Sequence, residues 1–260
     1  MNTTQKVIKT FAICLAALII LSIINGVAHL VTSAFSFNND VNINETYNSD
    51  INNIKIDVGT TNMVIKYGDT FSITAENVSK EFKIKEEGNT LIIKEKNITI
   101  FGNKKSSHTT ITIPNDLNNL SIDIGAGKLE LSDITSNNFS LNQGAGKVVI
   151  TNLISNNTTI DGGAGELHIT SSKLQNLDLD LGAGKCYYNG ILLGNNKIDQ
   201  GIGELILDLQ NDDYKFKVEK GLGSITVNGN SYSEDFEVGE GTNIIDIDGG
   251  VGSIIINTNK

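Results

Sequence analysis

The chain has 260 residues, of which 39% are hydrophobic and 19% are charged, so it can bury a core and is not compositionally disordered. Its formal net charge is −10, from 20 basic and 30 acidic residues, and every basic residue is a lysine. A net acidic chain without arginine is poorly suited to bind nucleic acid or to clamp a nucleotide phosphate, because both tasks depend on basic patches and bidentate arginine contacts.

The N-terminal part of the chain has the pattern of a membrane segment. Lys6 and Lys9 precede an apolar run that is densest from Phe11 to Ile24 and reaches 21 residues when it is extended to Val31. A helix of that length spans roughly 31 Å, enough to cross a bilayer. Because the lysines precede the run, we expect the N-terminus to stay in the cytoplasm and the rest to be exported. A cleaved signal peptide is the alternative, and it exports the rest as well.

Short alternating strands are predicted after the membrane segment. Ile54, Ile56 and Val58 alternate with polar residues, and the only proline, Pro114, sits where strand pairing would break. The predicted division is a cytoplasmic N-terminus (1–9), a transmembrane anchor (10–36), a linker (37–50), an N-terminal β-strand subdomain (51–113) and β-solenoid repeats (114–260).

A Gly-x-Gly element recurs throughout the last part. Four steps between successive elements are 19 residues, and the last two are 20 and 29. Each repeat holds two alternating strands and a connecting segment, too short for a βαβ unit. A fixed period of this size predicts an all-β, parallel β-helix-like solenoid of about seven coils; an antiparallel meander is the alternative. The elements begin at Gly125, Gly144, Gly163, Gly182, Gly201, Gly221 and Gly250.

Stacking the coils in chain order predicts four inward columns, with neighbours about 4.8 Å apart. Two of them begin at Leu129 and Leu131, and the first of these contains Cys186, which we therefore expect to be buried. Another begins at Ile122 and continues through Leu141, Ile160, Leu179, Ile198, Val218 and Ile247. The fourth is formed by the residues between the paired glycines, namely Ala126, Ala145, Ala164, Ala183, Ile202, Leu222 and Val251.

Two outward columns carry charge. One alternates in sign from Lys147 through Glu166 and Lys185 to Glu204, and it predicts ion pairs between coils. The other is acidic, and its like charges would repel. Either each side chain accepts a hydrogen bond from the glycine turn two residues later, or the column binds calcium through oxygen ligands. Its members are Asp123, Asn142, Asp161, Asp180, Asp199, Glu219 and Asp248, of which Asp161, Asp180 and Asp199 are the calcium candidates.

We find no catalytic or cofactor-binding residues in the sequence. The three histidines are isolated from one another, without the paired spacing of a zinc site. Cys14 lies in the N-terminal apolar run and Cys186 lies far away in the polar part of the chain, so a disulfide between them is not expected. The GAGK motifs are not P-loops, because the lysine is never followed by Ser or Thr.

The step from Gly221 to Gly250 is about ten residues too long, and the excess lies near 230–241. This insertion contains Phe236 and Val238, which would shield the end of the solenoid as a cap. A loop on a binding face is the alternative.

The segment ITIPNDLNNLSIDIGAGKLELSDI and the repeated GAGK-L-x-L pattern resemble the bacterial putative-adhesin family, domain of unknown function 4097, over roughly Ile51 to Asn257. This resemblance implies a right-handed β-helix-like domain that follows a membrane segment on the cell envelope, in some members linked to envelope stress. It carries over no catalytic or binding residues.

Two classes of function remain. The first is a non-catalytic protein of the cell membrane that presents its solenoid outside the cell, where a wall polymer or an envelope protein would be its partner. The second is a carbohydrate-active lyase or hydrolase, because such enzymes also use β-helices. The absence of arginine and tryptophan, and the repetition of every acidic position, favour the first.

Overall fold

The computed structural model describes residues 41–47, 50–95, 107–114 and 116–259. Within these ranges, no helix is long and apolar enough to span a membrane. The predicted anchor (10–36) and cytoplasmic N-terminus (1–9) lie outside the described residues, as does the start of the predicted linker. Fifteen strands belong to one sheet: β1 (Val41–Thr46), β2 (Asn53–Tyr67), β3 (Ser72–Val78), β4 (Phe82–Glu87), β5 (Thr90–Glu95), β6 (His108–Ile113), β7 (Leu117–Gln175), β8 (Leu177–Leu193), β9 (Asn195–Leu209), β10 (Tyr214–Glu219), β11 (Leu222–Val227), β12 (Asn230–Tyr232), β13 (Phe236–Val238), β14 (Asn243–Asp248) and β15 (Val251–Thr258).

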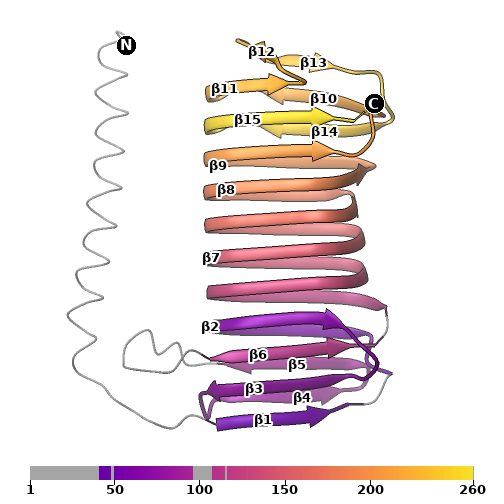
Figure 1. The fold of residues 1–260 in the computed structure, drawn as a ribbon, viewed down its shortest axis with the longest axis vertical. Coiled ribbons are helices and arrows are strands. Elements are labelled where there is room, and N and C mark those ends of the chain that lie inside the picture. The colour runs from indigo at the N-terminus through magenta and orange to yellow at the C-terminus, as the bar shows by residue number, and fades with distance from the viewer. Residues whose placement is uncertain (1–40, 48–49, 96–106, 115, 260) are drawn as a thin grey trace, which may run out of the picture. The chain divides into compact units, whose positions relative to one another are not determined.

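The centre of the molecule is a stack of parallel coils, which confirms the predicted all-β solenoid (Figure 1). The 59 residues of β7 wind through about three coils, and β8 and β9 each add one. Neighbouring coils pair in the register of the repeat, for example Ile160 with Leu179 and Leu179 with Ile198. Residues of the column that begins at Ile122 are all 2% exposed or less, so the alternation correctly predicted this part of the core.

The order of the last coils differs from the chain order that we expected. β14 pairs with β9 on one side and with β10 on the other, and β15 lies in the same way between β9 and β11. The last coil in the sequence is therefore inserted between its two predecessors. β12 and β13 then run antiparallel to β11 and β10, so they cover the outer edge of the last coil in space.

A column of outward charges explains why this order is favoured. Asp178 lies beside Lys197, Lys197 beside Asp246, Asp246 beside Lys217, and Lys217 beside Glu237. The charges thus alternate through five adjacent strands. In chain order Lys197 would lie next to Lys217, and directly opposed like charges destabilise a sheet.

The N-terminal end is built on the same plan. β2 lies between β7 on one side and β5 and β6 on the other, so it forms a coil that the sequence analysis did not assign. β3 and β4 cover the outer edges of β6 and β5 as antiparallel strands, and β1 pairs with β3. The predicted boundary at Pro114 falls between β6 and β7, and the sheet continues across it through β2.

At the Gly-x-Gly corner the backbones of successive coils come unusually close. A Cβ added to Gly163 would lie 2.1 Å from the carbonyl oxygen of Gly144, and one on Gly165 would lie 1.9 Å from that of Gly146. Gly165 also has a φ of 145°, which side chains rarely allow. Only glycine fits at these positions, and this explains the period of the motif.

The column between the paired glycines was predicted to point inward, and that prediction is wrong. Ala145, Ala164 and Ala183 are exposed, and Ile202 is 61% exposed. In six of the seven motifs the second glycine has a positive φ, which interrupts the alternation of the strand and turns the residue before it toward solvent.

Two columns of asparagines stabilise another corner of the coils. Each side-chain amide donates to the side-chain oxygen of the asparagine one coil earlier. In these pairs Asn137 donates to Asn118 (3.3 Å), Asn138 to Asn119 (2.9 Å), Asn156 to Asn137 (3.1 Å) and Asn157 to Asn138 (3.0 Å). The repeat pattern predicted a connecting segment at this corner but not these columns.

The inserted order predicts which cysteine pairs form disulfides. Glu204 and Ser253 are register partners, whereas Ser224 lies one coil further away. We expect the double variant Glu204→Cys/Ser253→Cys to be crosslinked by mild oxidation, because a disulfide needs Cα atoms less than about 7 Å apart. The matched variant Glu204→Cys/Ser224→Cys should stay reduced. Peptide mapping measures both, and the opposite result would establish chain order.

Candidate interaction surface along the glycine corner

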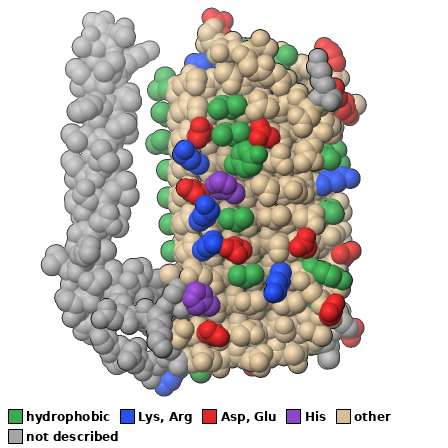
Figure 2. Space-filling model, viewed as in Figure 1, with side chains coloured by type: hydrophobic (Ala, Val, Ile, Leu, Met, Phe, Trp, Pro, Cys, Tyr) green, Lys and Arg blue, Asp and Glu red, His purple; other side chains and the backbone are tan. Residues whose placement is uncertain are grey.

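Three large aliphatic side chains form an exposed ridge on the glycine corner. Ile202 is 61% exposed, Val251 44% and Leu222 65%. Val251 is the register partner of both Ile202 and Leu222, so the three stand on consecutive coils. The ridge continues the column of alanines, because Ala183 pairs with Ile202. Figure 2 shows hydrophobic side chains along this left edge of the coil stack.

A column of alternating charges runs beside the ridge, as predicted. Lys147 contacts Glu166 at 2.9 Å, and Lys185 contacts Glu204 at 3.2 Å, both between adjacent coils. The hydrogen bond and the positive charge of Lys147 lower the pKa of the Glu166 carboxyl. These pairs are exposed, so they fix the register of the surface more than they add stability.

The acidic column stands on the other side of the ridge. Asp161 pairs in register with Asp180, Asp180 with Asp199, and Asp199 with Asp248. The structure therefore brings together all three calcium candidates. Within the described part of the chain, no group of three or more His, Cys, Asp or Glu side chains has an arrangement that could hold a metal ion. Calcium binding stays a prediction.

The expected hydrogen bonds from the glycine turn to this column are not formed. Asp199, a described residue of this column, contacts a side chain instead of the glycine backbone: the Nζ of Lys197 lies 2.6 Å from its carboxylate. The backbone of the glycine corner is instead part of the pairing between coils, so its N–H groups are not available to the carboxylates. The carboxylates project into solvent, where water and ions screen their repulsion.

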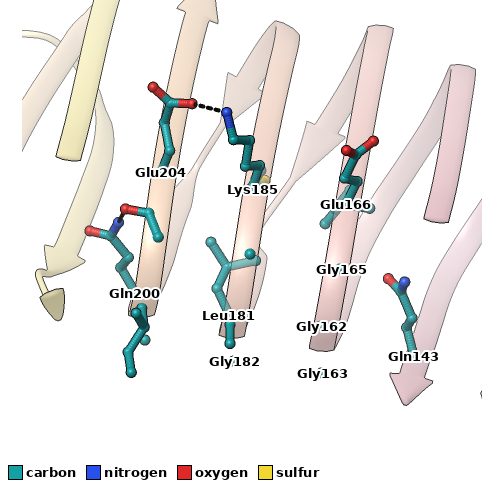
Figure 3. A pocket seen from close by; sticks show the side chains of 17 residues that line it. Gln143, Gly162, Gly163, Gly165, Glu166, Leu181, Gly182, Lys185, Gln200 and Glu204 are labelled. Carbon is teal, nitrogen blue, oxygen red and sulfur yellow. Dashed lines mark hydrogen bonds and ion pairs between the residues drawn. The ribbon is translucent and has the colours of Figure 1, made fainter. Parts of the chain in front are cut away.

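A small cavity lies under the glycine corner, where Gly162 leaves a gap between the side chains of Gln143 and Leu181 (Figure 3). Its volume is about 20 Å³, which is room for about one water molecule. Typical ligand pockets are more than ten times larger. Gln200 closes one side, and its amide donates to the carbonyls of Gly203 (3.1 Å) and Ser253 (3.3 Å).

Cys186 also lines this cavity but has no reactive character. Its side chain is buried, and burial raises the pKa of its thiol to about 12. The thiolate is the nucleophilic form, so a cysteine with such a pKa is inert at physiological pH. The prediction that Cys186 belongs to the core is confirmed.

A hollow of about 700 Å³ lies at the N-terminal end of the sheet, between β1 and β4. Its apolar floor includes Ile43, Ile84 and Ile92. The charges on its rim are partly paired, since Lys85 contacts Glu87 at 2.5 Å. Neither the sequence repeat nor the charge columns pointed to this place, because it lies outside the Gly-x-Gly coils.

The insertion at 230–241 acts as a cap on the structure, as its apolar residues predicted. The rings of Tyr232 and Phe236 stack with centroids 3.8 Å apart, and both pack against the core together with Val238. The carboxylate of Asp235 accepts a hydrogen bond from the backbone N–H of Lys220 (2.7 Å). The cap covers β10 and β11, which are the last coil in space although not in sequence.

This architecture matches a known protein family. A family model described as Toastrack DUF4097 matches residues 51–243. A search of curated proteins gave no match.

Three solved structures match most of this chain. A "putative adhesin" from Bacteroides fragilis has a TM-score of 0.57 and 17% identity, over 85% of this chain and 98% of that one. A "putative cell adhesion protein" from Clostridium sporogenes has a TM-score of 0.32 and 19% identity, over 85% of this chain and 100% of that one. A "putative lipid binding protein" from Parabacteroides distasonis has a TM-score of 0.37 and 15% identity, over 86% of this chain and 98% of that one. The first of these has the same fold.

The acidic column gives a test of calcium binding. A calcium ion needs six to eight oxygen ligands, whereas one outward column offers only carboxylates that point into solvent. We therefore expect the melting temperature to be the same in 2 mM calcium and in excess chelator, to within about 1 °C. Scanning calorimetry measures both. A rise of several degrees in calcium that Asp180→Asn abolishes and Asp212→Asn leaves intact would instead assign a cation site to this column.

Proposed function

The chain belongs to the Toastrack DUF4097 family, and from that premise we propose that it is a non-catalytic protein of the bacterial cell membrane whose solenoid faces outward and binds a wall polymer or an envelope protein. The observation that carries the proposal is the outer surface of the coils. The same kinds of side chain repeat on consecutive coils as straight columns, and the cavity beneath the corner admits no ligand larger than water, whereas the hollow of about 700 Å³ lies outside these coils, at the N-terminal end of the sheet. Such a surface suits an extended partner rather than a small substrate.

The sequence supports the proposed location. The apolar run from Phe11 to Val31, with lysines before it, suits a single membrane span with the solenoid outside the cell. The name of the Bacteroides fragilis protein suggests adhesion, and we extend that role to this chain as part of the proposal. A contribution to the envelope-stress response belongs to the same proposal.

The repeated acidic column supports a non-catalytic role. A hydrolase needs two carboxylates in different environments, one of which holds a proton. Asp161 and Asp180 are instead equivalent, exposed members of one column. The proposal therefore gives the acidic side chains a role in charge and solvation.

Labelling in intact cells tests the location. Ala183 is exposed on the corner, so the variant Ala183→Cys should react with a membrane-impermeant maleimide before the cells are opened. Cys186 is the internal control, because it is buried and should react only after denaturation. Labelling of Ala183→Cys only after lysis would contradict an outward-facing solenoid.

Co-sedimentation of the protein with purified cell walls tests the choice of partner. Retention in the pellet would support a wall polymer as the partner. Absence from the pellet, together with a crosslink to a membrane protein in the native envelope, would support an envelope protein. Absence of both would contradict the proposed binding role.

A further inference from the structure

The ridge of Ile202, Val251 and Leu222 brings three exposed large hydrophobic side chains together on consecutive coils. Six large hydrophobic side chains are exposed in the described part of the chain, and these three are adjacent to one another. The other exposed ones, such as Ile154, are not part of this column. Nothing in the fold requires size here, since the preceding coils carry alanine at the same position. Adjacent exposed apolar side chains of this kind mark an interaction site.

The pairing of the strands beneath the ridge indicates which kind of partner can bind there. β15 pairs with β9 on one side and with β11 on the other, and β9 also pairs with β8, so the strands that carry Val251 and Ile202 have no free edge. β12 covers β11 only from Ile225 to Val227, which leaves the short stretch Leu222–Ser224 open at the outer edge. An extended peptide that paired there would run along β11 and could not follow the ridge across the coils. An α-helix satisfies its own backbone hydrogen bonds and can dock through side chains alone.

Spacing and access also suit a helix. Successive ridge residues are about 4.8 Å apart, close to the 5.4 Å pitch of an α-helix, so three ridge residues can meet three successive turns. Glycines flank each ridge residue, and a Cβ on Gly223 or Gly252 would lie 1.6 or 1.8 Å from a neighbouring carbonyl. No side chain can stand beside the ridge, and a partner can therefore approach the backbone closely.

Charge defines the polar part of the partner. Asp248 and Glu219 lie on the same coils as Val251 and Leu222 and are exposed, whereas Glu204 on the other side is already paired with Lys185. The described residues contain 29 acidic residues and 14 lysines. This excess disfavours an anionic lipid surface, and it disfavours a second copy, whose acidic column would face this one. It favours a basic partner.

We propose that Ile202, Val251 and Leu222 form a docking ridge for an amphipathic α-helix of a partner protein, with one apolar face flanked by Lys or Arg. This inference rests on the proposed function in one respect only, namely that the chain acts by binding a partner. The apolar face packs on the ridge, and the basic residues meet Asp248 and Glu219.

A peptide titration tests the proposal. The full chain in nanodiscs of zwitterionic lipid is titrated against a fluorescent 18-residue peptide with Leu at every third or fourth position and Lys elsewhere, and empty nanodiscs give the background. We expect the triple variant Ile202→Ser/Val251→Ser/Leu222→Ser to bind at least about tenfold more weakly. Ile154→Ser, a matched change at an exposed residue outside the ridge, should leave binding unchanged.

Two further measurements keep the test decisive. Ala183→Leu lengthens the ridge by one coil and should tighten binding about threefold, a gain that damage to the fold cannot produce. A scrambled Leu/Lys peptide and a patterned Leu/Glu peptide should both bind more weakly than the patterned Leu/Lys peptide. Equal binding of the scrambled peptide, or full binding by the triple variant, would overturn the proposal. The titration does not depend on which side of the membrane the solenoid occupies, so it can fail while the proposed location holds.

Discussion

The close approach of backbones at the Gly-x-Gly corner is the constraint on which the rest of the structure depends. Each Gly-x-Gly coil places its paired glycines directly against the carbonyl groups of a neighbouring coil, where even a methyl group would collide. Coils that meet in this way cannot slip in register, because a shift would push a side chain into a backbone. Fixed register in turn lines up identical positions, and the buried columns, the asparagine columns and the charge pairs all follow from it. The outward ridge is a further consequence, since the residue between the glycines has nowhere to point except solvent.

The two ends of the stack solve a problem that every open sheet has, namely its unpaired edges. At each end a coil is interleaved out of chain order, and short antiparallel strands then cover the outermost coil. β14 and β15 hold β10 and β11 in place from inside, while β12 and β13 cover them from outside. Peeling off the terminal coil therefore requires two sets of pairings to break. The charges of Asp178, Lys197, Asp246 and Lys217 favour this arrangement, since they alternate only in the inserted order.

Much of this architecture could be predicted from the sequence, because a period of 19 residues repeats the same apolar inward positions and the same glycine corner in each repeat. The buried columns and the Lys147–Glu166 pair follow directly from that period. The direction of Ala164 could not be predicted in this way, because simple alternation fails where a glycine adopts positive φ. The coil of β2 carried a visible signal, since Asp57-Val58-Gly59 matches Asp123-Ile124-Gly125, but it lacks the second glycine. Coil order is a property of long-range pairing, and period alone does not encode it. The ridge emerges only when Val251 is placed between Ile202 and Leu222.

The glycine constraint can be separated from the conformational preference of glycine by two single substitutions. Gly163 has no positive φ, but its added Cβ would lie 2.1 Å from a carbonyl oxygen, whereas Gly88 has a φ of 59° and nothing within 4 Å. The most direct test compares the free energies of unfolding of Gly163→Ala and Gly88→Ala by urea denaturation. Close packing predicts a loss of at least about 2 kcal/mol for Gly163→Ala and about 1 kcal/mol for Gly88→Ala. A Gly163→Ala variant that is as stable as the wild type would contradict the account.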